Sequence, residues 1–383
     1  MPKIHVMTHT HWDRDWFLPQ EFINEWLDEL FERLKPLIET VPDYAYVIDG
    51  QTSIIDDFLE RRPEQRAAIE AWAEADNLLL GPYYGQIDWR VVSEESLMRN
   101  LYIGMRDAHR YGNCMDCGWV IDNFGHCSQS PQIHALFGIE DVFLWRGPVF
   151  DGDEIRSAFQ WEGGDGTRVR GHYLLSGYRN FYNLTDTPEF LDARISQMKG
   201  LLGPYSPSDK LIFLDGYDID IWPENPFEFL PADGEFVPSS PQVFAEAFKK
   251  DPGPEPLPVV QGELYSGKYA CVFPGSLSAR NYLRLQNAMV ERVLAYYVEP
   301  LQALTAQAGV SVDSEATLQM WKRLVGTQLH DCIGGVSVDQ VHDHTEITYR
   351  ELFDQATAAA KKAVTHLPSI LDLKMGAYAF TPS

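Results

Sequence analysis

The densest group of chemically useful side chains lies close to the start of the chain, where His9, His11 and Asp13 fall within five positions. They directly follow the largely apolar run 4–7, which predicts a β-strand. In α/β proteins, ligands collect at the carboxyl ends of the strands. Imidazole and carboxylate together are the usual ligands of zinc and similar divalent cations. The pattern predicts a metal site at the end of the first strand, with Trp16 and a second tryptophan as its aromatic wall.

Two further predicted strands end in carboxylates. Asp122 follows the apolar run 119–121 and precedes a turn that contains glycine. In that place a carboxylate binds a metal, attacks a sugar carbon or caps a helix, and the sequence pattern leaves these roles open. The run 211–214 leads into a segment with three aspartates, of which one at most need be catalytic. Two carboxylates from different strands are what glycoside hydrolysis requires.

A histidine and an aspartate, His330 and Asp331, stand near the end of a predicted helix that a Gly-Gly pair terminates. Two interpretations of this pair stay open. It completes a metal site from a second domain, or it is a helix end without function. His342 and His344 follow on a helix with many polar neighbours, and we interpret both as surface residues.

The composition excludes several classes of partner. The 383 residues carry a formal net charge of -25, whereas nucleic-acid binding needs a basic surface. No apolar run is long enough for a membrane span, and the start of the chain does not resemble a secretory signal. Five cysteines, an odd number, fit a reducing compartment. We therefore expect a cytoplasmic protein without nucleic-acid or membrane partners, and we leave homo-oligomer formation open.

Short strands and helices must alternate through the first two-thirds of the chain to position these residues. This order predicts an α/β fold with a mostly parallel sheet that closes as a barrel. Extra strands are expected as an insertion within 155–173. The other strands are expected at 4–8, 46–49, 78–81, 119–122, 142–145, 211–214 and 259–264, and the helices at about 20–41, 51–75, 93–111, 129–137, 187–201 and 241–250.

The pattern changes after Gly275. Apolar residues take helical spacing over 276–306, 313–333 and 338–366, which predicts a helix bundle packed against the barrel. The last residues, 377–380, have the composition of a strand that begins there.

Four motifs, HTHWDRDW, GWVIDNFGHCSQSPQI, LDGYD and QLHDCIGG, occur in this order and resemble those of the glycoside hydrolase family 38 α-mannosidases. The likeness runs from residue 4 to about 370 and includes GPYYGQIDWRVVSEESLMRNL. It implies a seven-stranded, mostly parallel β/α barrel over 1–268, followed by a three-helix bundle over 269–375. It also implies one divalent metal ion at their junction, with Zn²⁺ expected first and other divalent ions left open. The implied metal ligands are His11, Asp13, Asp122 and His330.

The resemblance also implies catalytic and binding roles. Asp122 falls on the nucleophile of the family and Asp218 on its general acid and base, with Asp215 and Asp220 as close competitors. The chain departs from the family in having Ile-Asp-Trp at 87–89 where Pro-Asp-Glu is usual. Family members usually carry β-rich domains after the bundle. The residues that fall on substrate contacts are Trp16, Asp88, Phe124, Arg146 and Asp331.

The expected function is therefore that of a metal-dependent retaining glycoside hydrolase. It would cleave terminal α-mannosides, free or in mannose-containing oligosaccharides, through a covalent glycosyl-aspartate. Two alternatives stay open. One is a metal-dependent deacetylase or amidase, whose metal activates a water molecule. The other is an inactive, sugar-binding fragment of a larger mannosidase.

Overall fold

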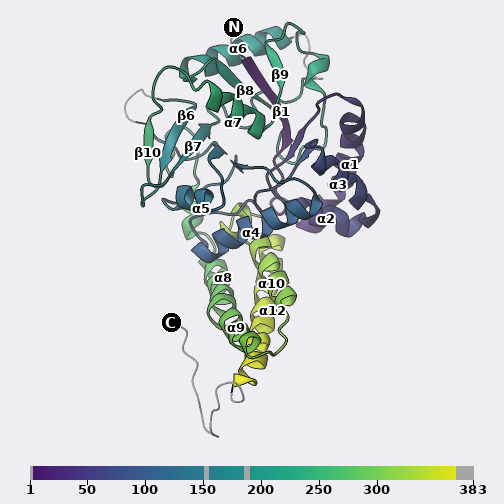
Figure 1. Cartoon of the computed structure of the whole chain (residues 1–383), viewed down its shortest axis with the longest axis vertical. Helices are drawn as coiled ribbons and strands as arrows, with labels where there is room; N and C mark the ends of the chain where they lie inside the picture. The colour runs from purple at the N-terminus through teal and green to yellow at the C-terminus, as the bar shows by residue number, and fades with distance from the viewer. Residues whose placement is uncertain (1–2, 151–154, 185–189, 368–383) are drawn as a thin grey trace.

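The structure is a computed structural model and describes residues 3–150, 155–184 and 190–367. Figure 1 shows two parts: an α/β part built from the first two-thirds of the chain, and a helical part that projects from it. The strands are β1 (Lys3–Thr10), β2 (Tyr46–Ile48), β3 (Leu78–Leu79), β4 (Cys117–Val120), β5 (Asp141–Leu144), β6 (Ala158–Glu162), β7 (Arg168–Tyr173), β8 (Lys210–Asp215), β9 (Phe236–Pro238) and β10 (Val259–Gln261).

The strands pair in two sheets. The first has the order β3-β2-β1-β8, with β9 also beside β1, and all its pairs are parallel. The second has the order β10-β6-β7-β5-β4, in which only β6 and β7 are antiparallel. A single parallel bridge, Leu80 to Cys114, connects the edge of the first sheet to the segment before β4. The predicted parallel α/β sheet is confirmed as a half-barrel, while its closure with seven strands stays a prediction.

The interior of the half-barrel is a packed apolar core. Met7, Val47, Trp119, Phe143 and Leu214 come from five different strands and pack together. Side chains alternate between the two faces of a strand, so residues two positions apart share a face. The residues that follow Met7 and Val47 on this inner face therefore lie at the carboxyl edge of the sheet.

One expectation about the strands was wrong. The segment 155–173 does not form an insertion apart from the main sheet, because β7 pairs in parallel with β5 and lies between β5 and β6. Only β6 runs antiparallel to its neighbour β7. The sequence pattern of β6 and β7 is that of a hairpin, and it does not reveal that one strand of the hairpin continues the parallel series.

Helices cover the outer face of the sheets. The caps of α4 (Glu94–Tyr111) show why its ends fall where they do, because the Ser93 side chain accepts a hydrogen bond from the Ser96 N–H at 3.2 Å and Gly112 follows the last turn. The remaining helices of the α/β part are α1 (Gln20–Thr40), α2 (Ser53–Arg61), α3 (Arg66–Glu74), α5 (Ser130–Leu136), α6 (Leu191–Leu202) and α7 (Pro241–Lys250).

The helical part consists of helices, as the spacing after Gly275 predicts. They are α8 (Asn281–Val293), α9 (Glu299–Gln307), α10 (Ser314–Gly326), α11 (His330–Ile333) and α12 (Asp339–Val364), with a π-helical turn, η6 (Leu294–Val298), that joins α8 to α9. The predicted stretch 313–333 is interrupted at 327–329 between α10 and α11. The description of this part as a bundle of three helices stays a prediction.

Buried ion pairs and backbone pairing fasten the helical part to the α/β part. Lys322 of α10 lies 2.8 Å from Asp56 of α2 and 2.5 Å from Asp107 of α4. The segment 328–330 pairs with 86–88, through an antiparallel bridge and hydrogen bonds from the His330 N–H to the Gln86 carbonyl (2.9 Å) and from the Asp88 N–H to the Gln328 carbonyl (3.3 Å). This pairing carries His330 to the edge of the sheets.

Two smaller predictions about the C-terminal third differ in their outcomes. His344 is exposed, as expected, but the expectation for His342 was wrong: it is buried and its Nε2 lies 3.0 Å from the Ser337 carbonyl. The strand expected at 377–380 lies outside the described residues. Across the residues that the structure describes, no helix combines the length and apolar character needed to cross a bilayer.

Candidate active site

The first strand presents His11 at the carboxyl edge of the sheet, on the inner face of the half-barrel. A wholly buried carboxylate, Asp49, follows β2, and its Oδ1 lies 3.1 Å from His11 Nδ1. Asp49 also accepts hydrogen bonds from the Trp12 N–H (2.9 Å) and from Gln51 Nε2 (2.8 Å). An acceptor at Nδ1 favours the tautomer that carries the proton there and leaves Nε2 free to bind a metal.

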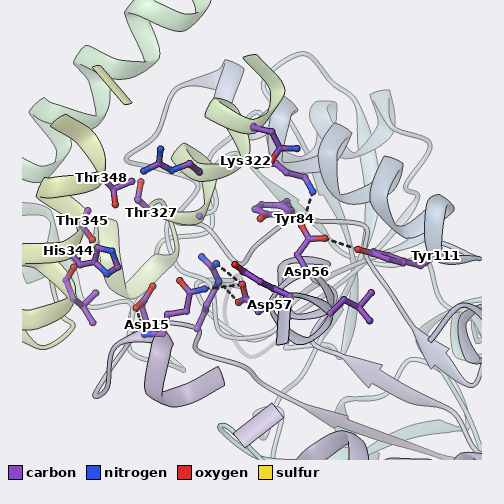
Figure 2. Close-up of a pocket in the computed structure, with 18 of the residues that line it drawn as sticks. Asp15, Asp56, Asp57, Tyr84, Tyr111, Lys322, Thr327, His344, Thr345 and Thr348 are labelled. Atoms are coloured by element: carbon purple, nitrogen blue, oxygen red, sulfur yellow. Dashed lines mark hydrogen bonds and ion pairs between the residues drawn. The ribbon is translucent and has the colours of Figure 1, made fainter. Parts of the chain in front are cut away.

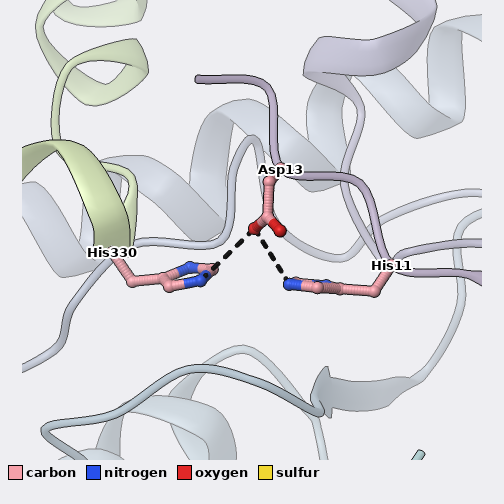
Figure 3. A group of neighbouring side chains, drawn as sticks. All are labelled: His11, Asp13 and His330. Carbon is pink, nitrogen blue, oxygen red and sulfur yellow. Dashed lines mark ion pairs between the residues drawn. The ribbon is translucent and has the colours of Figure 1, made fainter. Parts of the chain in front are cut away.

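Four potential ligand atoms lie close together here, and one of them is the Nε2 of His11. Its Nε2 lies 3.0 Å from Asp13 Oδ1 and 3.9 Å from Asp122 Oδ2. His330 brings its own Nε2 from α11 to 3.4 Å from the same Asp13 oxygen and 3.7 Å from the same Asp122 oxygen. Figure 3 shows His11 and His330 pointing at Asp13 from two sides. We call His11, Asp13, Asp122 and His330 the central group.

The spacing of the central group suits a divalent cation. Metal–ligand bonds of about 2.0–2.1 Å in a tetrahedron give ligand–ligand edges of about 3.3–3.4 Å. The four distances just given, from 3.0 to 3.9 Å, bracket that value. His11 Nε2 and Asp13 Oδ1 are buried and lie 3.0 Å apart, but neither makes a hydrogen bond of good geometry, so a cation between them would satisfy both. Nitrogen and carboxylate oxygen together are the donor set that zinc accepts.

The buried ionisable groups around His11 shift one another's pKa values. Burial lowers the pKa of His11, but Asp13 and Asp49 outweigh this effect and raise it well above its ordinary value. Burial raises the pKa of Asp13, and His11 reverses the effect, so that this pKa is lowered overall. The pKa of His330 is raised because Asp331 and Asp13 outweigh the opposing effect of burial. Protons and a cation would therefore compete for these imidazole nitrogens.

The carboxylate of Asp122 is held from its other side by Arg146. The guanidinium donates to Asp122 Oδ1 from Nη2 (2.6 Å) and from Nε (3.0 Å). Arg146 is itself anchored by a hydrogen bond from Nη1 to the Cys271 carbonyl at 2.5 Å. One oxygen of Asp122 therefore faces the two imidazoles while the other is fixed by an arginine. Burial nonetheless raises the pKa of Asp122, with Arg146 opposing it.

A second carboxylate, Asp218, lies beside the same strand end. Its residue forms a parallel bridge with His11, three residues after β8 ends. Asp218 Oδ1 accepts a hydrogen bond from the Tyr178 hydroxyl at 2.5 Å, and Oδ2 accepts one from Arg179 Nη1 at 3.0 Å. The Tyr178 ring lies 5.3 Å from the His11 ring, so Tyr178 links Asp218 to the central group.

The two competing aspartates lie on the other face of the strands. Asp215 pairs in register with Thr8, whose side chain alternates with the inward-facing Met7 and His9. Burial raises the pKa of Asp215 well above its ordinary value, and Glu224 adds to this. The Asp220 backbone N–H donates to the Thr10 hydroxyl, which also lies on the outer face. Asp215 and Asp220 therefore face away from His11.

The predicted substrate contacts divide into two sets. Phe124, Arg146 and Asp331 reach the central group: the Phe124 ring meets the His330 ring edge-on at 5.1 Å, and Asp331 Oδ2 lies 3.9 Å from His330 Nε2. Burial raises the pKa of Asp331 to about 7, with His330 opposing it. Trp16 packs instead against Phe17, edge-on at 5.0 Å, and against the apolar cluster of α1 and α2.

Asp88 is buried beneath the turn that follows Asp122. Its Oδ1 accepts a hydrogen bond from the Arg90 N–H at 2.9 Å, and burial raises its pKa to about 6. A Cβ at Gly125, whose φ is +81°, would stand 2.1 Å from this oxygen, so the position requires glycine. Asp88 therefore packs against the turn that contains Phe124 and Gly125.

Three residues of the site were not singled out from the sequence. They are Asp49, Tyr178 and Gln86, whose carbonyl lies 3.0 Å from His330 Nδ1. Asp49 had a detectable signal, because it ends a predicted strand and precedes a glycine, as Asp122 precedes a glycine-containing turn. Tyr178 and Gln86 lie in loops whose composition carries no such signal. His9 is structural, since its Nε2 lies 2.7 Å from the Tyr178 carbonyl.

Comparison with known proteins places this arrangement in a family. The sequence model described as "Glycosyl hydrolases family 38 N-terminal domain" matches residues 1–224, and the one described as "Alpha mannosidase middle domain" matches residues 272–367. A protein of Halalkalibacterium halodurans named "Putative mannosylglycerate hydrolase" is 28% identical over 374 residues, which cover 92% of this chain and 41% of that protein. The "Alpha-mannosidase" of Saccharomyces cerevisiae is 20% identical and covers 96% of this chain and 35% of its own length.

The comparison with solved structures agrees with these sequence matches. The crystal structure of an alpha-mannosidase from Enterococcus faecalis V583 matches with a TM-score of 0.91 and 29% identity, over 96% of this chain and 43% of that one. A 4-alpha-glucanotransferase from Thermococcus litoralis, 14% identical with a TM-score of 0.59 over 93% of this chain and 60% of that one, shares the fold alone. The chain spans less than half the length of the curated relatives it matches.

Proposed function

The chain belongs to glycosyl hydrolase family 38, and on that premise we propose that it is a metal-dependent retaining glycosidase of terminal α-mannosides. The activity is proposed for this chain itself, although it spans only 41% of the relative from H. halodurans. We also propose its division into a catalytic part, 1–268, and a helical part, 269–375, of which residues 368–375 lie outside the described residues. The matches to residues 1–224 and 272–367 support a boundary in this region.

The central group would hold one divalent cation, with zinc as the first expectation. Its support is the donor set, the spacing of the four atoms and the two buried atoms that make no well-formed hydrogen bond, His11 Nε2 and Asp13 Oδ1. When bound, the cation would supply positive charge to orient the hydroxyl groups of the sugar and to stabilise their charge in the transition state. Asp49 and the Gln86 carbonyl would fix the two imidazole rings from behind.

Two carboxylates would perform the covalent chemistry. A carboxylate oxygen of Asp122 would form a bond to the anomeric carbon while the bond from that carbon to the aglycone oxygen breaks. Asp218 would give its proton to the departing oxygen. Asp218 would then take a proton from water as the water oxygen attacks the same carbon and releases Asp122. Arg146, which binds Asp122 Oδ1, would favour the ionised form of the nucleophile against the effect of burial and fix the plane of its carboxylate.

The observation that carries the proposal is the convergence of two carboxylates on His11. Asp122 approaches the ring of His11 from one side, and Asp218 pairs with the backbone of His11 through the parallel bridge. A metal-dependent amidase needs the metal ligands and a water molecule, but it has no use for this second carboxylate. Retaining glycosidases need both, and their carboxyl groups stand about 5–5.5 Å apart. The pair therefore favours the glycosidase over the amidase.

The names of the relatives support a mannosyl substrate, whereas the aglycone stays open. The named relatives include an alpha-mannosidase and a protein named for mannosylglycerate, which share a mannosyl group and differ in what it is attached to. Phe124 and Asp331 flank the central group and would meet the ring and its hydroxyl groups. We therefore restrict the proposal to a terminal α-mannosyl group.

The direct test is hydrolysis of p-nitrophenyl α-mannoside by this chain, with p-nitrophenyl α-glucoside as the matched control. We expect turnover of the mannoside that a chelator abolishes and added Zn²⁺ restores. Asp122→Asn, which preserves the size of the side chain, should remove turnover. Saturable mannoside binding without turnover in the metal-loaded chain would contradict the proposal and favour the sugar-binding alternative. Turnover that is indifferent to the chelator would contradict the metal dependence.

A further inference from the structure

A cavity of about 620 Å³ lies where the helical part meets the α/β part. Figure 2 shows its walls: Asp56, Asp57 and Tyr84 on one side, and Thr345 and Thr348 of α12 on the other. Lys322 of α10 lies above them. Among the described residues that line this cavity, none belongs to the central group. We call it the junction cavity. Its volume is in the range of small-molecule sites, about 300–1,000 Å³.

The lining of the junction cavity is strongly polar, and its charges cancel. Tyrosine, threonine and glutamine side chains supply neutral hydrogen-bonding groups, and His344 is neutral in this count. With four basic and four acidic side chains, the walls prefer neither an anion nor a cation. The charged residues are Arg14, Arg66, Lys322 and Arg323, and Asp15, Asp56, Asp57 and Glu60.

Two of the basic side chains already form ion pairs with two of the acidic ones. Arg14 donates to both oxygens of Asp57, from Nε at 2.6 Å and from Nη2 at 2.8 Å. Lys322 Nζ lies 2.8 Å from Asp56 Oδ2, and Asp56 Oδ1 accepts the Tyr111 hydroxyl at 2.8 Å. A charged ligand would have to break these pairs, at a cost that burial increases. A neutral hydroxyl group can instead donate to the remaining carboxylate lone pairs and accept from remaining N–H groups.

We propose that the junction cavity is a second binding site, separate from the central group, for a neutral, hydroxyl-rich ligand such as a sugar unit or a polyol. Tyr84 and Tyr111 are among the lining residues, and the paired carboxylates would accept the hydroxyl groups of such a ligand. The proposal rests on the cavity alone. It would hold even if the central group had a different activity.

Occupancy of the junction cavity should strengthen metal binding. Two lining residues connect the cavity to the proposed metal ligands: Arg14 directly follows Asp13, and Thr327 stands three residues before His330. A ligand that contacts both walls stabilises the seating of α10 on the α/β part, and this seating also brings His330 to His11. Because coupling between two sites is reciprocal, a bound metal should in turn favour the ligand.

The experiment measures binding of two uncharged probes, methyl 1-thio-α-mannoside and D-mannitol, to the whole chain by saturation-transfer NMR, with succinate as the charged control. Chelator-treated protein is used first, so that the central group holds no metal. Two variants block the cavity from different helices, Thr348→Trp on α12 and Gln319→Trp on α10. Arg350→Trp is the control, because Arg350 is exposed on α12 and does not line the cavity.

We expect saturable binding of at least one neutral probe, weakened by about tenfold or more in both blocking variants and within about twofold of wild type in Arg350→Trp. Circular dichroism confirms that each variant is folded. Zn²⁺ titration with and without the probe should show tighter metal binding with it. Absence of saturable binding, binding unaffected by both blocking variants, or preferential binding of succinate would overturn the proposal. Hydrolysis of p-nitrophenyl α-mannoside reports on the proposed function separately.

Discussion

Replacement of Asp49 by asparagine tests whether the buried carboxylate behind His11 prepares the metal site. Asparagine has nearly the same shape and tolerates the positive φ of +51° at this position. The carboxylate accepts from three donors: His11 Nδ1, the Trp12 N–H and Gln51 Nε2. His11 Nδ1 lies 3.1 Å from Oδ1 and 3.0 Å from Oδ2. The other two donors bind Oδ2, so the single oxygen of asparagine is retained there. Its amide NH₂ group then faces His11 Nδ1.

An N–H donor in place of Oδ1 removes one of the two acceptors beside Nδ1 and opposes the tautomer that carries its proton there. It favours a ring with its proton on Nε2, the atom that lies 3.0 Å from Asp13 Oδ1. A metal can bind this nitrogen only after the tautomer is restored against an unfavourable contact. Loss of such a supporting carboxylate typically weakens metal binding by about 10–100-fold. This corresponds to about 1.4–2.8 kcal/mol.

The assay is competition for Zn²⁺ between the protein and a chromogenic chelator. Asp141→Asn is the matched control, because Asp141 is equally buried and its Oδ1 lies 2.7 Å from His172 Nε2 at a place remote from the central group. We expect Asp141→Asn to lower stability and to leave the zinc affinity unchanged. A folded Asp49→Asn protein that binds zinc within about threefold of wild type would refute the reasoning.

Further predictions concern the site and the stability of the fold. Asp122→Ala should abolish turnover and weaken zinc binding together. Asp218→Asn should leave zinc binding unchanged and slow the hydrolysis of mannosides with poor leaving groups by about 10²–10⁴-fold, with less effect on p-nitrophenyl mannoside. Equal losses on both kinds of substrate would point to another acid. Burial lowers the pKa of His126 to about 3 and that of His134 to about 4. Between these values and the ordinary 6.5 only the unfolded chain binds the protons, so stability should fall as pH is lowered from 7 to 5, by about 2 kcal/mol per histidine. Urea unfolding at the two pH values checks this, and a His134→Asn variant with an unchanged slope would contradict it. Lys322→Met leaves the buried Asp107 without its closest cation and should lower the free energy of unfolding by about 3 kcal/mol. A loss below about 1 kcal/mol would contradict this prediction.

The sequence predicts those parts of the site that follow strand periodicity. His11, Asp13 and Asp122 stand directly after strands that are buried and parallel, and the carboxyl ends of such strands share one edge. Convergence at that edge is therefore predictable from local pattern. His330 could be tied to the same place only through the family motifs, because the antiparallel pairing of 328–330 with 86–88 that carries it there joins distant segments.

The choice among three aspartates shows where local pattern fails. Asp215, Asp218 and Asp220 are close neighbours in sequence, and their spacing does not say which of them faces the interior. The face is decided by register: Asp215 pairs with Thr8, and Asp218 forms the bridge with His11 after the strand has ended. A slip of one residue reverses the faces, so the choice needs the tertiary pairing.

Trp16 packs on Phe17 and the α1–α2 cluster, and its predicted contact with the sugar stays a prediction. The sequence did not single out Asp49, Tyr178 or Gln86. They act on the central group through contacts between loops, and such contacts leave no periodic signal in the sequence.

The most direct measurement of the central claim is the identity of the residue that carries the sugar during turnover. The zinc-loaded chain is incubated with 5-fluoro-α-mannosyl fluoride, which slows hydrolysis of a glycosyl-enzyme, and is then digested and examined by mass spectrometry. We predict a single mannosyl adduct on Asp122, absent after chelator treatment. An adduct on Asp218 or another residue, or full turnover of the reagent with inverted product and no adduct, would contradict a metal-dependent retaining mechanism centred on Asp122.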